Sequence, residues 1–336
     1  KRAITLDLGL DEAREALYAL VRESDVFLTS FLPATRQKLG FDVEDLKRIN
    51  PKLIFAKGTG GGPLGPERFR GGYDGAHFWH RGSLASSVMN VAKIDSPPNA
   101  VGHGDGMSGL VLAGGIVAAL LHRERTGEAV VVDSSLLGTA TWFNAPAIIG
   151  NAVDGPDGTF GRFIPRKNQQ WSGATYRTAD DRWIGMLHLG DHQDEFVNLC
   201  EHLQRIDLVG DPRFASSGDR IANSADLMSI LDEVFASRTL EAWKEILITS
   251  KGVWAPIQTI DEMQDDVQVQ ANRMIRTVRY GDKEQPVVMP PIMFNEDAGP
   301  CDPAPDFNAH TEEVLRDIAG YGDAKISELR RVGAIA

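Results

Sequence analysis

The first part of the chain alternates short apolar runs with segments in which apolar residues recur at helical spacing. In residues 11–22, for example, Ala13, Ala16 and Leu20 share one helical face. The predicted strands cover residues 3–8, 25–29, 52–57 and 129–133, and the predicted helices cover residues 11–22, 43–49, 107–125 and 136–149. Strand–helix–strand units of this spacing are typical of a parallel sheet with helices on its faces. The pattern therefore predicts an α/β fold with a Rossmann-like parallel-sheet domain.

The pattern changes near residue 150. Residues 151–173 are rich in Gly, Asp, Pro and Gln, which predicts a linker or an active-site loop. A strand pattern at 183–187 is followed by helical patterns near 191–203, 224–236 and 239–249. We predict a large α/β domain at 1–150, the loop at 151–173, a smaller α+β domain at 174–290, and a C-terminal segment at 291–336 that returns to the large domain.

The chain is acidic, with 35 Lys and Arg against 47 Asp and Glu in 336 residues and a net charge of −12. An acidic surface repels nucleic acids and anionic membranes, so we expect neither as a partner. An anionic ligand would then need a local group of lysine and arginine side chains.

The two cysteines and the most apolar stretch narrow the class of protein further. Cys200 and Cys301 are far apart and form no CxxC pair, which argues against a disulfide framework or a zinc site and predicts a cytoplasmic location. The apolar stretch 107–121 is shorter than the roughly 20 residues that a membrane-spanning helix needs. We therefore expect a buried helix there.

Asp105 is the main candidate for chemistry. It lies in the glycine-rich run 102–109, just before the predicted helix. One interpretation is an N-cap, in which the side chain accepts a hydrogen bond from a free backbone N–H. The other is a nucleophile, because glycine neighbours leave the carboxylate open to a ligand and the helix dipole favours its anionic form. The spacing alone leaves both open.

Three other features carry weaker signals. His103 is either a base partner for Asp105 or a structural residue. His77 and His80 have the i, i+3 spacing of a metal pair, but no third ligand lies at a motif distance, so we predict no metal site. The glycine run 58–62 follows a strand, yet it lacks the GK[ST] ending of a phosphate loop.

Several stretches taken in order resemble the class III CoA-transferase family, also called the CaiB/BaiF family. The opening KRAITLDL is similar to the family's first "KRSI-LDL" strand, and HGDGMSG followed by AALLHRERTG is similar to its "D..SG…AALL.RERTG" core. The stretches that carry the resemblance are 1–8, 30–33, 38–40, 50–54, 71–74, 104–109, 118–127, 132–136 and 310–315. Together they run through nearly the whole chain.

The resemblance implies a fold and an assembly. It implies the CoA-transferase fold of an interlocked homodimer, in which each chain threads through a ring formed by the other. It also implies that a first segment of the family fold, with its first strand and part of the CoA site, is missing from this chain.

The resemblance further implies a reaction, with coenzyme A, as acyl-CoA, and a carboxylic acid as substrates and with no metal. Asp105 matches the family's nucleophile, which forms a mixed anhydride with the donor acyl group and then an aspartyl-CoA thioester. The positions that match the family's CoA contacts are Leu6, Asp7, Leu8, Gly9, Ser30, Phe31, Leu32, Lys38, Gly71, Gly72, Tyr73 and Asp74. Lys38 stands where the family usually has Arg, and Ser30 stands where Asn is usual.

Two alternatives stay open beside the transferase. The family includes acyl-CoA racemases whose catalytic His lies in a Gly-His-Asp motif, but the matching residues here are Gly72, Tyr73 and Asp74. Tyrosine, with an ordinary pKa near 10, is a poor base for an α-proton at neutral pH. The other alternative is an inactive acyl-CoA-binding protein. Arg81 is either a group that holds the acceptor carboxylate or a cation of the surface or of the dimer interface.

Overall fold

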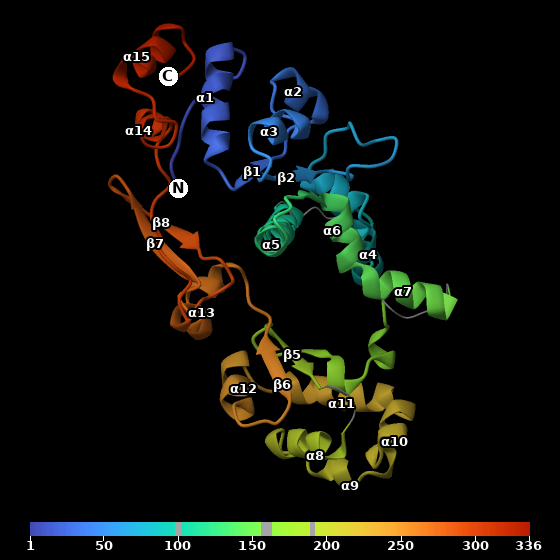
Figure 1. The fold of residues 1–336 in the computed structure, drawn as a ribbon. Helices are drawn as coiled ribbons and strands as arrows, with labels where there is room; N and C mark the ends of the chain where they lie inside the picture. The colour runs from blue at the N-terminus through green and yellow to red at the C-terminus, as the bar shows by residue number, and fades with distance from the viewer. Residues whose placement is uncertain (98–101, 156–162, 189–191) are drawn as a thin grey trace. The chain divides into compact units, whose positions relative to one another are not determined.

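The computed structural model describes residues 1–97, 102–155, 163–188 and 192–336 (Figure 1). The chain forms two compact units. Unit 1 consists of Lys1–Phe163 and Ala304–Ala336, and unit 2 consists of Ile164–Pro303. Each unit has its own hydrophobic core.

Unit 1 alternates strands and helices along the chain. Its elements are α1 (Asp11–Arg22), β1 (Val26–Thr29), α2 (Pro33–Lys38), α3 (Val43–Ile49), β2 (Ile54–Thr59), η1 (Asp74–His80), α4 (Leu84–Ala92), α5 (His103–Thr126), β3 (Val131–Ser135), α6 (Leu136–Phe143), α7 (Ala145–Asp154), α14 (Thr311–Asp317) and α15 (Asp323–Arg331). The element η1 is a short π-helix. Helix α7 extends to Asp154, so the first residues of the stretch 151–173 are helical, and residues 156–162 of that stretch lie outside the described residues.

The predicted parallel sheet is confirmed. Strands β1, β2 and β3 lie in that order, and both pairs are parallel, with Val26 opposite Ile54 and Phe55 opposite Val131. The apolar run Ile54, Phe55 and Ala56 of β2 is fully buried. A continuous apolar run is what a central strand covered on both faces requires.

The prediction of a strand at residues 3–8 is wrong. These residues form no strand, and their backbone bonds instead to the C-terminal part of unit 1. The N–H of Thr5 donates to Thr311 Oγ1 at 2.9 Å, and the N–H of Asp7 donates to the Ala334 carbonyl at 3.0 Å. Because these partners are a side chain and a loop carbonyl, the segment is extended without joining a sheet.

Helix α5 begins and ends close to the prediction, but it is not buried. It ends at Gly127, which has a φ of +78° that favours glycine. One side of α5 contacts β2, β3, α6 and η1. The other side exposes apolar residues, among them Val117 at 65%. We expected the length of this helix to exclude a membrane span, but α5 has 24 residues and is long and apolar enough to cross a membrane. Core helices of soluble proteins pass the same test.

Unit 2 packs helices against a small antiparallel sheet. Its elements are β4 (Thr175–Arg177), β5 (Trp183–Leu187), α8 (Gln193–His202), α9 (Asp207–Gly210), α10 (Ser217–Ala222), α11 (Ser224–Phe235), α12 (Leu240–Leu247), β6 (Val253–Pro256), α13 (Val267–Ala271), β7 (Ile275–Tyr280) and β8 (Lys283–Val288), with 3-10 turns η3 (Arg166–Asn168), η4 (Trp171–Gly173), η5 (Pro212–Phe214) and η6 (Asp261–Gln264). Strand β5 pairs with β4 and β6, and β7 and β8 form a separate hairpin. The core of unit 2 is rich in large rings, such as Trp171, Tyr176 and Trp243.

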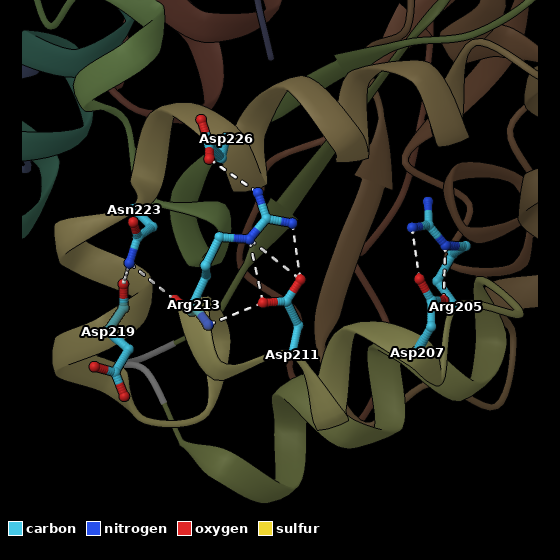
Figure 2. A network of polar contacts seen from close by, with 7 residues as sticks. All are labelled: Arg205, Asp207, Asp211, Arg213, Asp219, Asn223 and Asp226. Carbon is cyan, nitrogen blue, oxygen red and sulfur yellow. Dashed lines mark hydrogen bonds and ion pairs between the residues drawn. The ribbon is translucent and has the colours of Figure 1, made fainter.

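An exposed polar network joins the short helices of unit 2 (Figure 2). The Arg213 guanidinium bonds to Asp211 at 2.8 Å and to Asp226 at 3.0 Å, which links η5 to α11. The Asn223 amide donates to the backbone carbonyls of Arg213 and Asp219. The bond from Arg213 lowers the pKa of the Asp211 carboxyl. Because exposed ion pairs are screened by water, we assign this network a local, structural role.

Candidate active site

Unit 1 contains a cavity of about 560 Å³ at the carboxyl ends of its three parallel strands. Ser30 follows β1, Thr59 ends β2, and Ser135 ends β3, and all three line the cavity. Ligands of open parallel sheets bind at this edge, where the loops leave the strands. The lining residues are Ser30, Phe31, Leu32, Pro33, Thr35, Gly58, Thr59, Gly60, Gly61, Gly62, Arg68, Arg70, Gly71, Gly72, Tyr73, Asp105, Ser108, Gly109, Leu112, Ser134, Ser135 and Leu136.

Asp105 lines this cavity from the first turn of α5. The N-cap position of α5 is Gly102, with a φ of +85°, and no side chain caps the helix there. The N-cap interpretation of Asp105 is therefore wrong. Asp105 is exposed, and its carboxylate makes no hydrogen bond or ion pair with any residue that the structure describes. The carboxylate is free to meet a ligand at the helix end where the dipole favours negative charge.

Asp74 holds the start of α5 from outside the helix. Its side chain is 6% exposed and accepts bonds from the N–H of Gly102 at 2.6 Å and of Gly104 at 3.0 Å. Gly104 packs so closely against Asp74 and Phe78 that a Cβ at this position would overlap both. Asp74, predicted as a CoA contact, thus lies behind the start of α5 and not among the cavity-lining residues.

Two glycine loops form another part of the cavity. A Cβ on Gly60 would lie 2.6 Å from the Cα of Gly72, so the two backbones touch because neither residue has a side chain. The ring of His77 packs beneath both loops, and its Nδ1 is buried without a hydrogen-bond partner. Gly71, Gly72 and Tyr73, which we predicted from the sequence, line the cavity through these loops.

The turn after β1 is held in place by Arg36. Arg36 is buried, bonds to the Asp42 carboxylate at 2.9 Å, and donates to the Phe31 carbonyl at 2.5 Å. This turn brings the predicted residues Ser30, Phe31 and Leu32 to the cavity.

Other predicted CoA contacts lie away from the cavity. Lys38 is exposed at the end of α2 and does not line it. The segment of Leu6, Asp7, Leu8 and Gly9 forms the turn before α1 and does not line it either. Some of its backbone groups are already engaged, since the Gly9 N–H bonds to the Asp7 carboxylate and the Leu8 carbonyl accepts from Arg14.

Two arginines that the sequence analysis missed, Arg68 and Arg70, add positive charge to the cavity. Glu67 bonds to Arg70 at 2.8 Å and also to Arg81. The bonds from Arg81 and then Arg70 lower the pKa of the Glu67 carboxyl. Arg81, for which holding an acceptor carboxylate was one of the open roles, is therefore paired and does not line the cavity. Their position in the sequence, just before the predicted CoA contact Gly71, could have indicated that Arg68 and Arg70 lie at the site.

Within the described part of the chain, none of the three histidine candidates lines the cavity. Among the described residues, no group of three possible ligands surrounds His77 or His80. His103 does not line the cavity, and its ring meets Trp79 edge-on at a centroid distance of 6.2 Å.

Known proteins share both the sequence and the fold. The family model described as CoA-transferase family III matches residues 1–311. An (R)-2-hydroxy-4-methylpentanoate CoA-transferase of Clostridioides difficile is 30% identical over 98% of this chain and 82% of its own length. A cinnamoyl-CoA:phenyllactate CoA-transferase of Clostridium sporogenes is 29% identical over 98% of this chain and 80% of its own length. A succinyl-CoA:mesaconate CoA-transferase of Haloarcula hispanica is 30% identical over 96% of this chain and 80% of its own length.

Solved structures agree with these relatives. The structure of Rv3272 from Mycobacterium tuberculosis aligns with a TM-score of 0.78 and 28% identity, over 94% of this chain and 83% of that chain. A CaiB/BaiF family protein from Brucella suis aligns with a TM-score of 0.76 and 27% identity, over 95% of this chain and 82% of that chain. The chain therefore belongs to CoA-transferase family III, the CaiB/BaiF family, and is an enzyme of CoA transfer.

Proposed function

We propose that this enzyme moves CoA from an acyl-CoA donor to a carboxylic acid acceptor through intermediates on Asp105. The observation that carries the proposal is the Asp105 carboxylate, which lines the cavity in the first turn of α5 without a bonding partner among the described residues. The relatives support the substrate classes, because their names give 2-hydroxy-4-methylpentanoate, phenyllactate and mesaconate, which are all carboxylic acids.

The proposed reaction exchanges one acyl bond at a time. An oxygen of the Asp105 carboxylate attacks the thioester carbon of the donor, the C–S bond breaks, and CoA leaves as a thiolate. The thiolate then attacks the Asp105 carbon of the mixed anhydride, which releases the donor acid and leaves an aspartyl-CoA thioester. The acceptor carboxylate attacks this thioester, and the thiolate returns to the acceptor acyl carbon and frees Asp105. Covalent catalysis of this kind divides one difficult exchange into easier steps.

Each tetrahedral intermediate carries an oxyanion that needs donors. Gly61 and Gly71 line the same cavity as Asp105, and no backbone or side-chain acceptor among the described residues takes their N–H groups. We propose that these N–H groups stabilise the oxyanion. Fixed backbone donors are effective because they need no reorientation during the reaction.

We assign the CoA end of the substrate to the loops around the cavity. Ser30, Phe31, Leu32, Gly71, Gly72 and Tyr73 would contact the sulfur end and the pantetheine arm. The nucleotide end would extend outward toward Lys38 and the turn at 6–9, which do not line the cavity. Lys38 supplies a positive charge for a phosphate, although it lacks the fork of an arginine.

We also propose a cytoplasmic homodimer of the interlocked type, without nucleic acid or membrane as a partner. The support for the homodimer is the exposed apolar surface of α5 and α7, which includes Val117 at 65% and Ile149 at 62% exposure. Exposed apolar surface of this kind marks an interaction site in a soluble protein.

Trapping with hydroxylamine tests the role of Asp105. In the presence of an acyl-CoA donor, hydroxylamine should convert Asp105 to a hydroxamate that peptide mass spectrometry detects. Asp105→Ala should abolish both CoA transfer and the adduct, because no other carboxylate lines the cavity. The matched control is Asp302→Ala, an exposed aspartate in unit 2, which should keep full activity.

Two results would contradict this proposal. Ordinary turnover by Asp105→Ala would exclude Asp105 as the nucleophile, and the absence of an adduct with every donor would favour an inactive acyl-CoA-binding protein. Rapid exchange of the α-proton of a 2-methylacyl-CoA in deuterated water, without any acceptor, would instead indicate a racemase.

A further inference from the structure

The cavity that holds Asp105 contains two cations with different surroundings. Arg70 is already in an ion pair with Glu67 at 2.8 Å, and the same carboxylate also bonds to Arg81. Arg68 lines the same cavity and forms no ion pair with any residue that the structure describes. Of the two, Arg68 is therefore the one whose guanidinium has no carboxylate partner among the described residues and can pair with an anionic ligand.

The Arg68 guanidinium packs against a neighbouring ring and keeps most of its N–H donors. It lies over the ring of Phe69, 4.2 Å from the ring centroid, which is a cation–π contact. Among the described residues, the guanidinium makes one hydrogen bond, a long contact of 3.5 Å from Nη1 to the Gly65 carbonyl. The ring contact leaves the N–H groups of the guanidinium available, and they can bind a carboxylate through two parallel bonds.

Negative charge in the cavity opposes the binding of an anionic acceptor, and a cation would reduce this repulsion. The acceptor is an anion, and it must approach a cavity that contains the Asp105 carboxylate in a protein with a net charge of −12. A second carboxylate on the substrate would increase this repulsion unless a cation lay at the other end of the acyl group. Arg68 supplies that charge.

We propose that Arg68 binds the second, non-reacting carboxylate of a dicarboxylic substrate and so determines the acyl specificity of the enzyme. This inference rests on the proposed role of Asp105, because the reacting carboxyl group must lie at Asp105 while the other lies at Arg68. CoA itself carries anionic phosphates, but the pantetheine arm separates them from the sulfur that must lie near Asp105. A short dicarboxylate places its two carboxyl groups within a single cavity.

The test compares acids of equal chain length with one or two carboxyl groups, such as butyrate with succinate and valerate with glutarate. Arg68→Gln should raise the KM for the dicarboxylic acids about tenfold to a hundredfold, because it removes a charge-assisted bond. It should leave kcat and the KM for the monocarboxylic acids within about twofold. Arg68→Lys keeps the charge without the fork and should fall between wild type and Arg68→Gln. Arg125→Gln, an exposed arginine outside the cavity, should change neither KM.

A second arm separates the carboxylate from the CoA phosphates. Thioesters of pantetheine lack the nucleotide, so a loss in Arg68→Gln that occurs with CoA thioesters and disappears with pantetheine thioesters would overturn the proposal. Equal loss for both kinds of acid would also overturn it. So would a wild-type enzyme that exchanges CoA among monocarboxylic acids and accepts no dicarboxylic acid. In these three cases the hydroxylamine adduct on Asp105 would still form, so the proposed function would survive.

Discussion

The Asp105 side chain is open to the cavity because three nearby residues are glycines, each of which affects the start of α5 differently. Gly102 begins α5 with a positive φ, and Gly104 lets the helix start pack against Asp74 and Phe78. Gly106 has no neighbouring atom within 4 Å of the position that a Cβ would occupy. Gly104 thus helps to fix the position of Asp105, whereas Gly106 leaves open space beside it.

A pair of alanine substitutions tests this difference. Gly104→Ala forces a methyl group into Asp74 and Phe78 and should cost about 1–3 kcal/mol in the free energy of unfolding. By shifting Asp105 it should also lower kcat about a hundredfold, the effect expected of a misplacement of about 1 Å. Gly106→Ala should keep or raise stability, since alanine favours a helix over glycine by roughly 0.5–1 kcal/mol. If Gly104→Ala and Gly106→Ala changed the free energy of unfolding in urea and kcat in steady-state kinetics by equal amounts, this account would be contradicted.

At the scale of elements, the site depends on how short helices are joined. Arg36 of α2 reaches both the Phe31 carbonyl at the cavity and Asp42, the N-cap of α3. Burial tends to raise the pKa of the Asp42 carboxyl, but the bonds from Arg36 and the Val43 N–H together outweigh it, and the pKa is lowered. The same pair therefore supports the turn after β1 and the start of α3.

Asp42→Asn tests this pair through its pH dependence. Asparagine can still cap the helix, so the substitution mainly removes the charge. Because the pKa is lowered in the folded state, the carboxylate stabilises the protein above the unfolded pKa of about 3.9 and loses this effect as the pH falls through the folded value. Asp42→Asn should cost about 1–3 kcal/mol at neutral pH, and the difference from wild type should shrink as the pH falls below about 4.

The control for this measurement lies on the same helix. Glu44→Gln removes an exposed carboxylate of α3 that forms no ion pair among the described residues, and it should have little effect at either pH. A difference between Asp42→Asn and wild type that stays constant from neutral to acidic pH in urea unfolding would show that charge pairing is not its cause.

At the scale of the whole molecule, apolar surface is distributed in a way that one chain does not explain. The core of unit 2 encloses its aromatic residues, whereas α5 and α7 of unit 1 expose many of their apolar side chains. The proposed homodimer would cover this surface. The two units are each compact, and only unit 1 has this combination of a long apolar helix and low burial among the described residues.

A charge placed on this surface tests the homodimer. Val117→Glu would bury an unpaired carboxylate in the interface and should weaken the dimer at least about tenfold, because an unpaired buried charge costs several kcal/mol. Analytical ultracentrifugation would measure the dissociation constant. Ile248→Glu changes an apolar residue of unit 2 that is 75% exposed and should have no such effect. A wild-type monomer, or an unchanged dimer in Val117→Glu, would contradict the assignment of the interface to α5.

Local patterns in the sequence predicted the three parallel strands and several helices of unit 1, since these depend on the order of nearby residues, but they missed α4 and the strands β4, β6, β7 and β8. The apolar run of β2, the end of α5 at Gly127 and the parallel order of the sheet all followed from spacing and periodicity. The strand predicted at residues 3–8 was wrong because an extended apolar segment becomes a strand only when it finds a partner strand, and its partners here are Thr311 and Ala334. The prediction that α5 is buried was wrong for a similar reason, since composition does not show what covers a helix.

The candidate site shows the same division between local and distant information. The sequence alone determined that Asp105 stands among glycines at the start of a helix and that the chain resembles a family in which this position reacts. Only the tertiary structure decided that Asp74 supports the helix from behind, that Lys38 lies away from the cavity and that Arg68 lines it unpaired. Which charges are neutralised depends on residues that approach one another in space after the chain folds. The spacing of residues along the chain contains no record of those distances.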